Sequence, residues 1–280
     1  MCAEAALPPC FDRQRHLEPL ALITVHGWDH PRLQAELARA VRMARPWFAA
    51  GLPPPASACW EDLQLPIDKV AQIPASRIQR APISAEIAAR IGQADRPEVT
   101  AAVRVLALRL RIGQAVPGDL LALHAALLPD APAGLRRGSI ALRRADDSID
   151  FQAPSADFLD EGLAFILAEA NRAVAGGDLA TLAGCYAAIN FLHPFADGNG
   201  RTSRRLLLAG MGACLDTDLS PLPIDLVVWC NRTYHDYRLR QITQANHWGA
   251  WIAFVAQMLC HAVSRLPAPA IPVPLAQGSA

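Results

Sequence analysis

The sequence at residues 193–204 is His-Pro-Phe-Ala-Asp-Gly-Asn-Gly-Arg-Thr-Ser-Arg, a polar stretch between two apolar helical patterns. The first pattern repeats apolar residues at helical spacing up to His193, and Pro194 prevents that helix from continuing. The second pattern begins near Gly200 and continues through an apolar run. The sequence therefore predicts a helix–loop–helix unit, with buried Phe195 as the loop anchor.

The polar residues of this loop are suited to phosphate chemistry. His193 is a base whose charge changes near neutral pH, and Asp197 is a hard oxygen ligand suited to Mg²⁺ beside phosphate. The Gly-Asn-Gly turn at residues 198–200 can point backbone N–H groups into one concavity. Arg201 and Arg204 are three residues apart, so on a helix they can reach the same anion. The loop therefore predicts a site for phosphoryl or nucleotidyl transfer, and the alternative is a simple polar turn.

The same stretch resembles the signature of the Fic family, His-Pro-Phe-x-(Asp/Glu)-Gly-Asn-(Gly/Lys)-Arg-x-x-Arg, at every fixed position. The resemblance implies an all-α fold, a helical bundle with a short β-hairpin flap beside the active site. It also implies a protein adenylyltransferase, which transfers AMP from ATP to a Ser, Thr or Tyr hydroxyl of a target protein. In this comparison His193 is the catalytic base and Asp197 holds Mg²⁺. The residues implied to bind ATP and its phosphates are Gly198, Asn199, Gly200, Arg201 and Arg204.

Two other regions fit the resemblance. Residues 139–142 and 148–152 are short strand-like runs around a polar turn. The flap hairpin of the family pairs with the backbone of a target protein, so we expect a target to dock on about residues 139–152. Tyr234 and Tyr237 are three residues apart and can line a nucleotide-base pocket on one helix face, although core packing explains either ring equally well.

The inhibitory position of the family is degenerate in this chain. Many Fic proteins carry a Ser-x-x-x-Glu-Gly turn whose glutamate pairs with the second arginine of the signature and blocks productive ATP binding. Residues 75–80 read Ala-Ser-Arg-Ile-Gln-Arg, with Gln79 at the glutamate position. Glutamine can bond a guanidinium but brings no charge. Glu61 is a poorer alternative, because aspartate follows it. Inhibition is therefore weakened, absent, or supplied by a separate inhibitory protein.

Composition narrows the class of protein. The chain has 280 residues, of which 52% are hydrophobic and 19% charged, as in a globular protein with a sizeable core. Its 26 basic and 26 acidic residues leave no net positive field, so we expect no nucleic-acid partner. Seven scattered cysteines without a C-x-x-C pair indicate a reducing compartment. No signal peptide or membrane span is visible, so we expect a cytoplasmic enzyme with no membrane partner.

The chain divides by pattern into three parts. We expect an N-terminal helical extension over residues 1–94, a Fic domain over residues 95–265 and a Pro-rich tail over residues 266–280. Residues 20–25 form the one strand-like run near the start. The sequence leaves the oligomeric state open, a homodimer included.

Other functions stay open at this point. The family also transfers phosphate, UMP or other nucleotide-derived groups. An inverted nucleotide is disfavoured, because that branch has lysine at the position of Gly200 and lacks the second arginine. Removal of AMP is disfavoured because it depends on the glutamate replaced here by Gln79. A non-enzymatic module that only binds ATP would leave the complete signature unexplained.

Overall fold

The computed structural model describes residues 10–23, 25–49, 96–143, 149–264 and 266. The described α-helices are α1 (Arg13–His16), α2 (Pro31–Ala49), α4 (Pro97–Arg111), α5 (Pro117–Leu127), α6 (Leu159–Gly176), α7 (Leu179–Leu192), α8 (Asn199–Leu215), α9 (Ile224–Cys230), α10 (Arg232–Ala245) and α11 (Trp248–Ser264). Two 3₁₀ helices are η1 (Glu18–Leu22) and η7 (Ala156–Phe158). Strands β1 (Ala141–Arg143) and β2 (Ile149–Gln152) complete the described elements, so the predicted all-α fold with one hairpin is confirmed.

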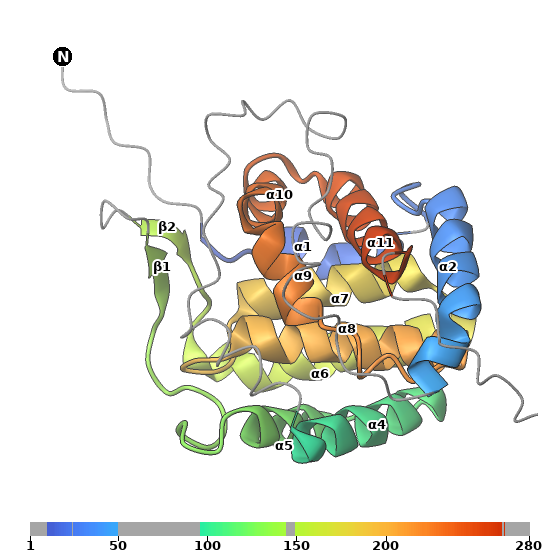
Figure 1. Ribbon diagram of the computed structural model, residues 1–280. Helices are drawn as coiled ribbons and strands as arrows, with labels where there is room; N and C mark the ends of the chain where they lie inside the picture. The colour runs from blue at the N-terminus through green and yellow to red at the C-terminus, as the bar shows by residue number, and fades with distance from the viewer. Residues whose placement is uncertain (1–9, 24, 50–95, 144–148, 265, 267–280) are drawn as a thin grey trace, which may run out of the picture.

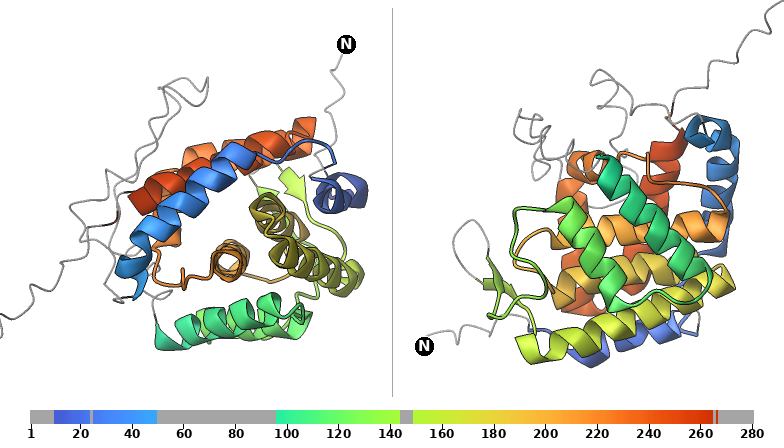
Figure 2. Two further views of the ribbon diagram at one scale, coloured as in Figure 1. Left: turned by 90° about the vertical axis from the view of Figure 1, so that its right-hand side faces the viewer. Right: turned by 90° about the horizontal axis from the view of Figure 1, so that it is seen from below.

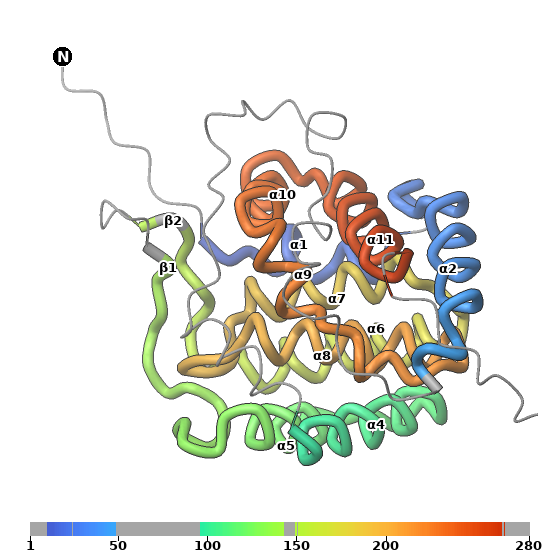
Figure 3. The backbone as a smooth tube through the Cα atoms, in the orientation of Figure 1, coloured from blue at the N-terminus to red at the C-terminus, as the bar shows by residue number. Residues whose placement is uncertain are grey.

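Helix α8 lies at the centre of the bundle. It packs against α7, α4, α5 and α6, and in a view along its axis these helices and the α2–α11 pair surround it (Figure 2, left). Figure 3 shows that α7 and α8 run side by side in opposite directions and that the loop joining them lies on the side of the molecule that carries the hairpin. The predicted helix–loop–helix unit thus forms the middle of the fold, and its loop faces the hairpin.

Small residues allow the central helices to approach closely. A Cβ atom on Gly210 of α8 would lie 2.6 Å from Cδ2 of Leu182 in α7. A Cβ atom on Gly184 of α7 would lie 2.7 Å from Leu20 and 2.8 Å from Ile23. Real Cβ atoms do not come this near, so the packing of α7 against both neighbours depends on glycine at these two positions.

The hairpin is tied to the helical body at its base. Its strands are antiparallel, with Leu142 opposite Phe151 and an irregularity in register between Leu142 and Arg143. Phe151 is buried, and its ring lies 5.6 Å from that of Phe191, near the end of α7. One strand of the flap is therefore anchored beside the helix that leads into the signature loop (Figure 1).

The strand predicted at residues 20–25 is wrong. The chain instead forms η1 at Glu18–Leu22, which has Pro19 in its first turn. Leu17, Leu20 and Ile23 are all buried, and their three-residue spacing places them on one side of this turn, against α7. A short apolar run does not distinguish a strand from a helical turn without this packing information.

The described N-terminal residues share the main core. Leu37, Val41 and Trp47 of α2 belong to the same buried cluster as residues of α7, α8 and α11, and α2 packs against α11. Residues 31–49 are therefore not a separately packed unit. The predicted boundary at residue 94 and most of the predicted tail fall outside the described residues. Within the part of the chain that the structure describes, no helix is long and apolar enough to cross a bilayer.

Candidate active site

His193 stands at the end of α7 with its backbone in the left-handed region (φ 49°, ψ 57°). Its N–H donates to the carbonyl oxygen of Ile189 at 2.9 Å. Ring atom Nδ1 lies 3.2 Å from the carbonyl oxygen of Asn190. A carbonyl only accepts, so Nδ1 carries the hydrogen in this contact and Nε2 keeps its lone pair.

The surroundings of His193 favour the neutral ring. Burial lowers its pKa, and this effect outweighs the bond from Nδ1 to the Asn190 carbonyl, which raises it. The guanidinium of Arg136 lowers the pKa further, while the carboxylate of Asp197 raises it. At pH 7 His193 is therefore a neutral base whose accepting atom is Nε2.

The loop after His193 is held from two sides. The ring of Phe195 is buried and stacks on His124, with 3.9 Å between ring centroids and 7° between planes. Atom Nε2 of His124 lies 2.9 Å from the carbonyl oxygen of Asp197. The amide of Asn199 accepts from the N–H of Phe195 and donates to its carbonyl, both at 2.9 Å. The sequence predicted the anchor Phe195, whereas the contact of His124 with the loop was not predicted.

These contacts give Asn199 a different role from the one that the resemblance implies. Both ends of its side-chain amide are bonded to the backbone of Phe195, and the side chain is buried. The side chain therefore braces the loop. What Asn199 offers to an anion is its backbone N–H in the first turn of α8.

The first turn of α8 forms an anion cradle. Gly198 is the N-cap, with φ 81°, a backbone conformation that favours glycine, and a Cβ atom there would lie 2.3 Å from Cδ1 of Leu128. The first helical bond runs from the N–H of Thr202 to the carbonyl of Gly198 at 2.9 Å. The N–H groups of residues 199–201 precede that bond and, with the helix dipole, suit a negatively charged group.

Asp197 and Arg201 face each other at the rim of this cradle. The side chain of Asp197 is 71% exposed, and its Oδ2 accepts from Nη2 of Arg201 at 2.9 Å. Its Oδ1 accepts from the N–H of Gly198 at 2.5 Å. In the described part of the chain, no group of three or more His, Cys, Asp or Glu side chains is placed to hold a metal ion. One exposed carboxylate fits Mg²⁺ only when substrate phosphates supply further ligands, which is the usual mode of this ion.

Arg204 is held by an aspartate that the sequence analysis missed. Nε of Arg204 donates to Oδ1 of Asp225 at 2.6 Å, and Nη2 of Arg205 donates to Oδ2 at 2.8 Å. Burial raises the pKa of Asp225, but the two guanidinium groups bring it below its usual value. A Cβ atom on Gly200 would lie only 3.1 Å from Nη1 of Arg204, so glycine leaves room for this guanidinium beside the first turn of α8.

The two predicted base-pocket tyrosines lie in different environments. Tyr234 is 1% exposed, its ring packs edge-on against Phe254 with 4.8 Å between centroids, and Arg238 donates to its hydroxyl at 2.7 Å. This ring is part of the core, so the predicted base-stacking role for Tyr234 is corrected. Tyr237 is 40% exposed, and its base-pocket role stays a prediction.

Several predicted features lie outside the described residues. Gln79 and the surrounding turn at residues 75–80 are among them, as is the alternative Glu61. Of the expected docking segment at about residues 139–152, the strands are described and residues 144–148 are not.

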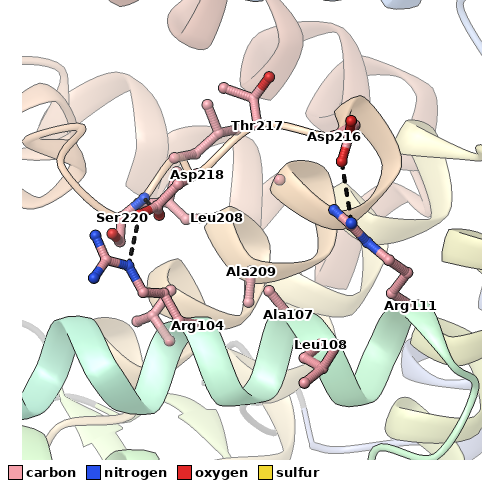
Figure 4. Close-up of a pocket in the computed structure, with 13 residues that line it drawn as sticks. Arg104, Ala107, Leu108, Arg111, Leu208, Ala209, Asp216, Thr217, Asp218 and Ser220 are labelled. Carbon is pink, nitrogen blue, oxygen red and sulfur yellow. Dashed lines mark hydrogen bonds and ion pairs between the residues drawn. The ribbon is translucent and has the colours of Figure 1, made fainter. Parts of the chain in front are cut away.

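The described part of the chain has cavities beside α4 and beside the approach to β1. One, of about 290 Å³, lies between α4 and the chain after α8, flanked by the ion pairs Arg104–Asp218 (2.7 Å) and Arg111–Asp216 (3.0 Å) (Figure 4). It opens beside the C-terminal half of α8 and does not include the signature loop. Another, of about 500 Å³, is lined by the approach to β1 and by Ala196 of the signature loop.

Residues 116–209 match the model of the Fic/DOC family. Among solved structures, a Fic family protein from Desulfovibrio desulfuricans G20 is similar to this chain at 20% sequence identity, with a TM-score of 0.48. The similarity covers 92% of this chain and 75% of that one. A search of curated proteins found no match. The matched segment contains His193, the loop after it and most of α8.

Proposed function

We propose that residues 116–209, which match the model of the Fic/DOC family, belong to a Fic domain, and that the protein transfers AMP from ATP to a Ser, Thr or Tyr hydroxyl of a target protein. The domain makes it a Fic-type transferase of a nucleotide-derived group. The observation that carries the proposal is the placement of a neutral histidine base and an anion-binding helix terminus at the two ends of one braced loop. His193 ends α7, Phe195 and Asn199 fix the loop, and α8 begins at Asn199.

His193 acts as the general base of this reaction. Its Nδ1 is engaged with the carbonyl of Asn190, so Nε2 is the atom that takes the proton from the attacking hydroxyl. The oxygen then bonds to the α-phosphorus of ATP, and the bond to the leaving pyrophosphate breaks. A base of lowered pKa is in its accepting form at neutral pH, which suits this step.

The groups around the first turn of α8 bind the phosphates. The N–H groups of residues 199–201 face the α-phosphate and stabilise its developing charge, and Arg201 and Arg204 bind toward the pyrophosphate end. For this, Arg201 has to leave its exposed pair with Asp197, which is a small loss because such pairs contribute about 0–1 kcal/mol. Mg²⁺, held by Asp197 and the phosphates, would neutralise charge on the leaving group.

The remaining parts of the proposal concern partners. The target protein docks along the hairpin by strand addition, next to the cavity lined by Ala196 of the signature loop. Tyr237 contributes to the base pocket. Because Gln79 occupies the inhibitory position, the enzyme is inhibited by a separate inhibitory protein or is not inhibited. The enzyme works in the cytoplasm, in keeping with the pattern of its cysteines.

Intact-mass spectrometry tests the proposal on the purified chain. After incubation with ATP and Mg²⁺, the mass of the chain or of an added target should increase by one adenylyl group. The variant His193→Ala should show no increase, because no other group takes the proton from the hydroxyl. His247→Ala is the matched control, since His247 is exposed and lies in the link between α10 and α11, and it should react like the parent. Addition of a phosphoryl group in place of AMP would reject the proposal.

A further inference from the structure

Arg136 lies in the segment between α5 and β1 and is one of the most buried charged residues described, at 7% exposure. Its side chain donates from Nε to the carbonyl of His193 at 2.7 Å and from Nη2 to the carbonyl of Leu192 at 3.4 Å. It also donates from Nη1 to the carbonyl of Gly138 at 2.6 Å and from Nη2 to the carbonyl of Pro154 at 2.7 Å. All four acceptors are backbone carbonyls.

Two of these carbonyls belong to Leu192, the last residue of α7, and to His193, its C-cap. The final carbonyls of a helix have no partner within it and lie at the negative end of the helix dipole, where a cation is stabilising. The helix cannot supply hydrogen-bond donors to these carbonyls by continuing, because Pro194 follows His193. The backbone N–H of Arg136 adds a further bond, to the carbonyl of Pro194 at 2.9 Å. Arg136 therefore caps the helix that carries the base.

The other two carbonyls belong to the ends of the hairpin. Gly138 precedes β1 and Pro154 follows β2, so the same guanidinium holds the chain where it enters the hairpin and where it leaves. A planar guanidinium with donors on three nitrogens can bridge such separate acceptors, whereas the single ammonium of lysine cannot hold the same set.

We propose that Arg136 is a positioning residue, which fixes the flap hairpin relative to His193 so that a hydroxyl presented along the hairpin meets Nε2. This inference rests on the proposed function, because it assigns the flap and the base to one reaction. Arg136 itself contacts backbone groups and not the reacting atoms. Its removal should therefore impair transfer to a protein target while leaving the phosphate cradle at the first turn of α8 in place.

The main test compares Arg136→Lys with Arg137→Lys. Arg137 is the adjacent residue and is exposed, so it is the matched control for the same substitution. We expect Arg136→Lys to lower kcat for AMP transfer at least 10-fold, with the Kd for ATP changed less than 2-fold, and Arg137→Lys to behave like the parent. Parent-like kcat in Arg136→Lys would overturn the inference, as would a loss of ATP affinity as large as the loss of kcat.

Amide hydrogen exchange tests the role of Arg136 without requiring AMP transfer. In Arg136→Lys, the amides of β1 and β2 and those of Leu192 and His193 should exchange faster together, while those of α8 stay as protected as in the parent. Unchanged exchange in the hairpin would overturn the inference even if activity fell. A parent protein that transfers no AMP would reject the proposed function, and the exchange result would still decide whether Arg136 couples the hairpin to His193.

The dependence of kcat/KM on pH distinguishes the effect of the charge of Arg136 from that of its hydrogen bonds. Arg136 and Asp197 are the charged groups that act on His193, in opposite directions. In Arg136→Gln the acid limb of kcat/KM should move to higher pH, because a positive charge that lowers the pKa of His193 is lost. In Arg136→Lys the limb should stay near that of the parent. Equal limbs in parent and Arg136→Gln would show that Arg136 does not act on the base.

Discussion

Arg204 donates from Nε to Oδ1 of Asp225 at 2.6 Å, so the second arginine of the signature is already paired within the chain. In the family resemblance, the inhibitory glutamate pairs with this same arginine. Asp225 differs from such a glutamate, because it is buried and is shared with Arg205. Two guanidinium groups against one carboxylate leave the cluster with a positive charge, which remains available to a phosphate.

Asp225→Asn should therefore destabilise the protein. The substitution keeps the shape but leaves two largely buried guanidinium groups without their carboxylate, and loss of one partner of a buried pair costs about 3–5 kcal/mol. Urea unfolding would measure it. Asp218→Asn is the control, since Asp218 pairs with the exposed Arg104 and such a pair contributes about 0–1 kcal/mol. Equal, small effects of the two substitutions would contradict a structural role for Asp225.

The same cluster predicts a loss of stability in acid. The pKa of Asp225 is lower in the folded chain than its ordinary value, so the folded state favours the carboxylate. This contribution is complete above the unfolded pKa of about 3.9 and is lost as pH falls through the lower folded value. Unfolding free energies between pH 5 and pH 2 should fall less steeply in Asp225→Asn than in the parent. Parallel curves would count against this assignment.

The rate of transfer should persist to mildly acidic pH. Burial lowers the pKa of His193 below its ordinary value of 6.5, so Nε2 stays unprotonated over a wider range. The rate then falls as pH drops through that lowered value. A profile of kcat/KM against pH, recorded with saturating Mg²⁺, should show its acid limb below pH 6.5. An acid limb above 6.5 would be inconsistent with His193 in this environment.

His124 should matter through its bond to the carbonyl of Asp197 as well as through stacking on Phe195. His124→Phe keeps an aromatic ring on Phe195 but removes the donor, and one hydrogen bond contributes about 0.5–1.5 kcal/mol. We expect kcat/KM to fall about 3- to 10-fold, with a higher Mg²⁺ requirement because Asp197 is less firmly placed. His124→Ala should lose more and also lower the melting temperature. If His124→Phe matches the parent, stacking alone accounts for this residue.

Gln79→Glu tests the inhibitory turn proposed from the sequence. The new carboxylate should pair with Arg204 in competition with Asp225 and slow self-modification by the purified chain. Gln72→Glu makes the same change in charge seven residues earlier and is the matched control. A Gln79→Glu variant as fast as the parent would show that the inhibitory position does not lie at residues 75–80.

The sequence predicted the fold where a local pattern determines structure. The apolar spacing before His193, the proline after it and the apolar run after Gly200 were sufficient for α7, the loop and α8. The strand expected at residues 20–25 was wrong, because its burial depends on contact with Gly184, far away in the chain.

The supporting residues of the site could not be predicted in this way. His124 lies 73 residues from Asp197, and Arg136 lies 57 residues from His193. Both side chains bond to backbone carbonyls. Every residue has a backbone carbonyl, so the sequence of the partner segment does not reveal the contact. The bonds from the side-chain amide of Asn199 to the backbone of Phe195 could not be predicted either, because they depend on the folded loop.

The proposed transfer of AMP, with His193 as the base, can be tested with labelled ATP. The purified chain, with Mg²⁺ and a target protein or alone, would receive ATP labelled at the α-phosphate or at the γ-phosphate. We expect protein-bound label to come only from the α-labelled ATP and to disappear in His193→Ala. Label that enters from the γ-phosphate, or α-label that persists in His193→Ala, would contradict it.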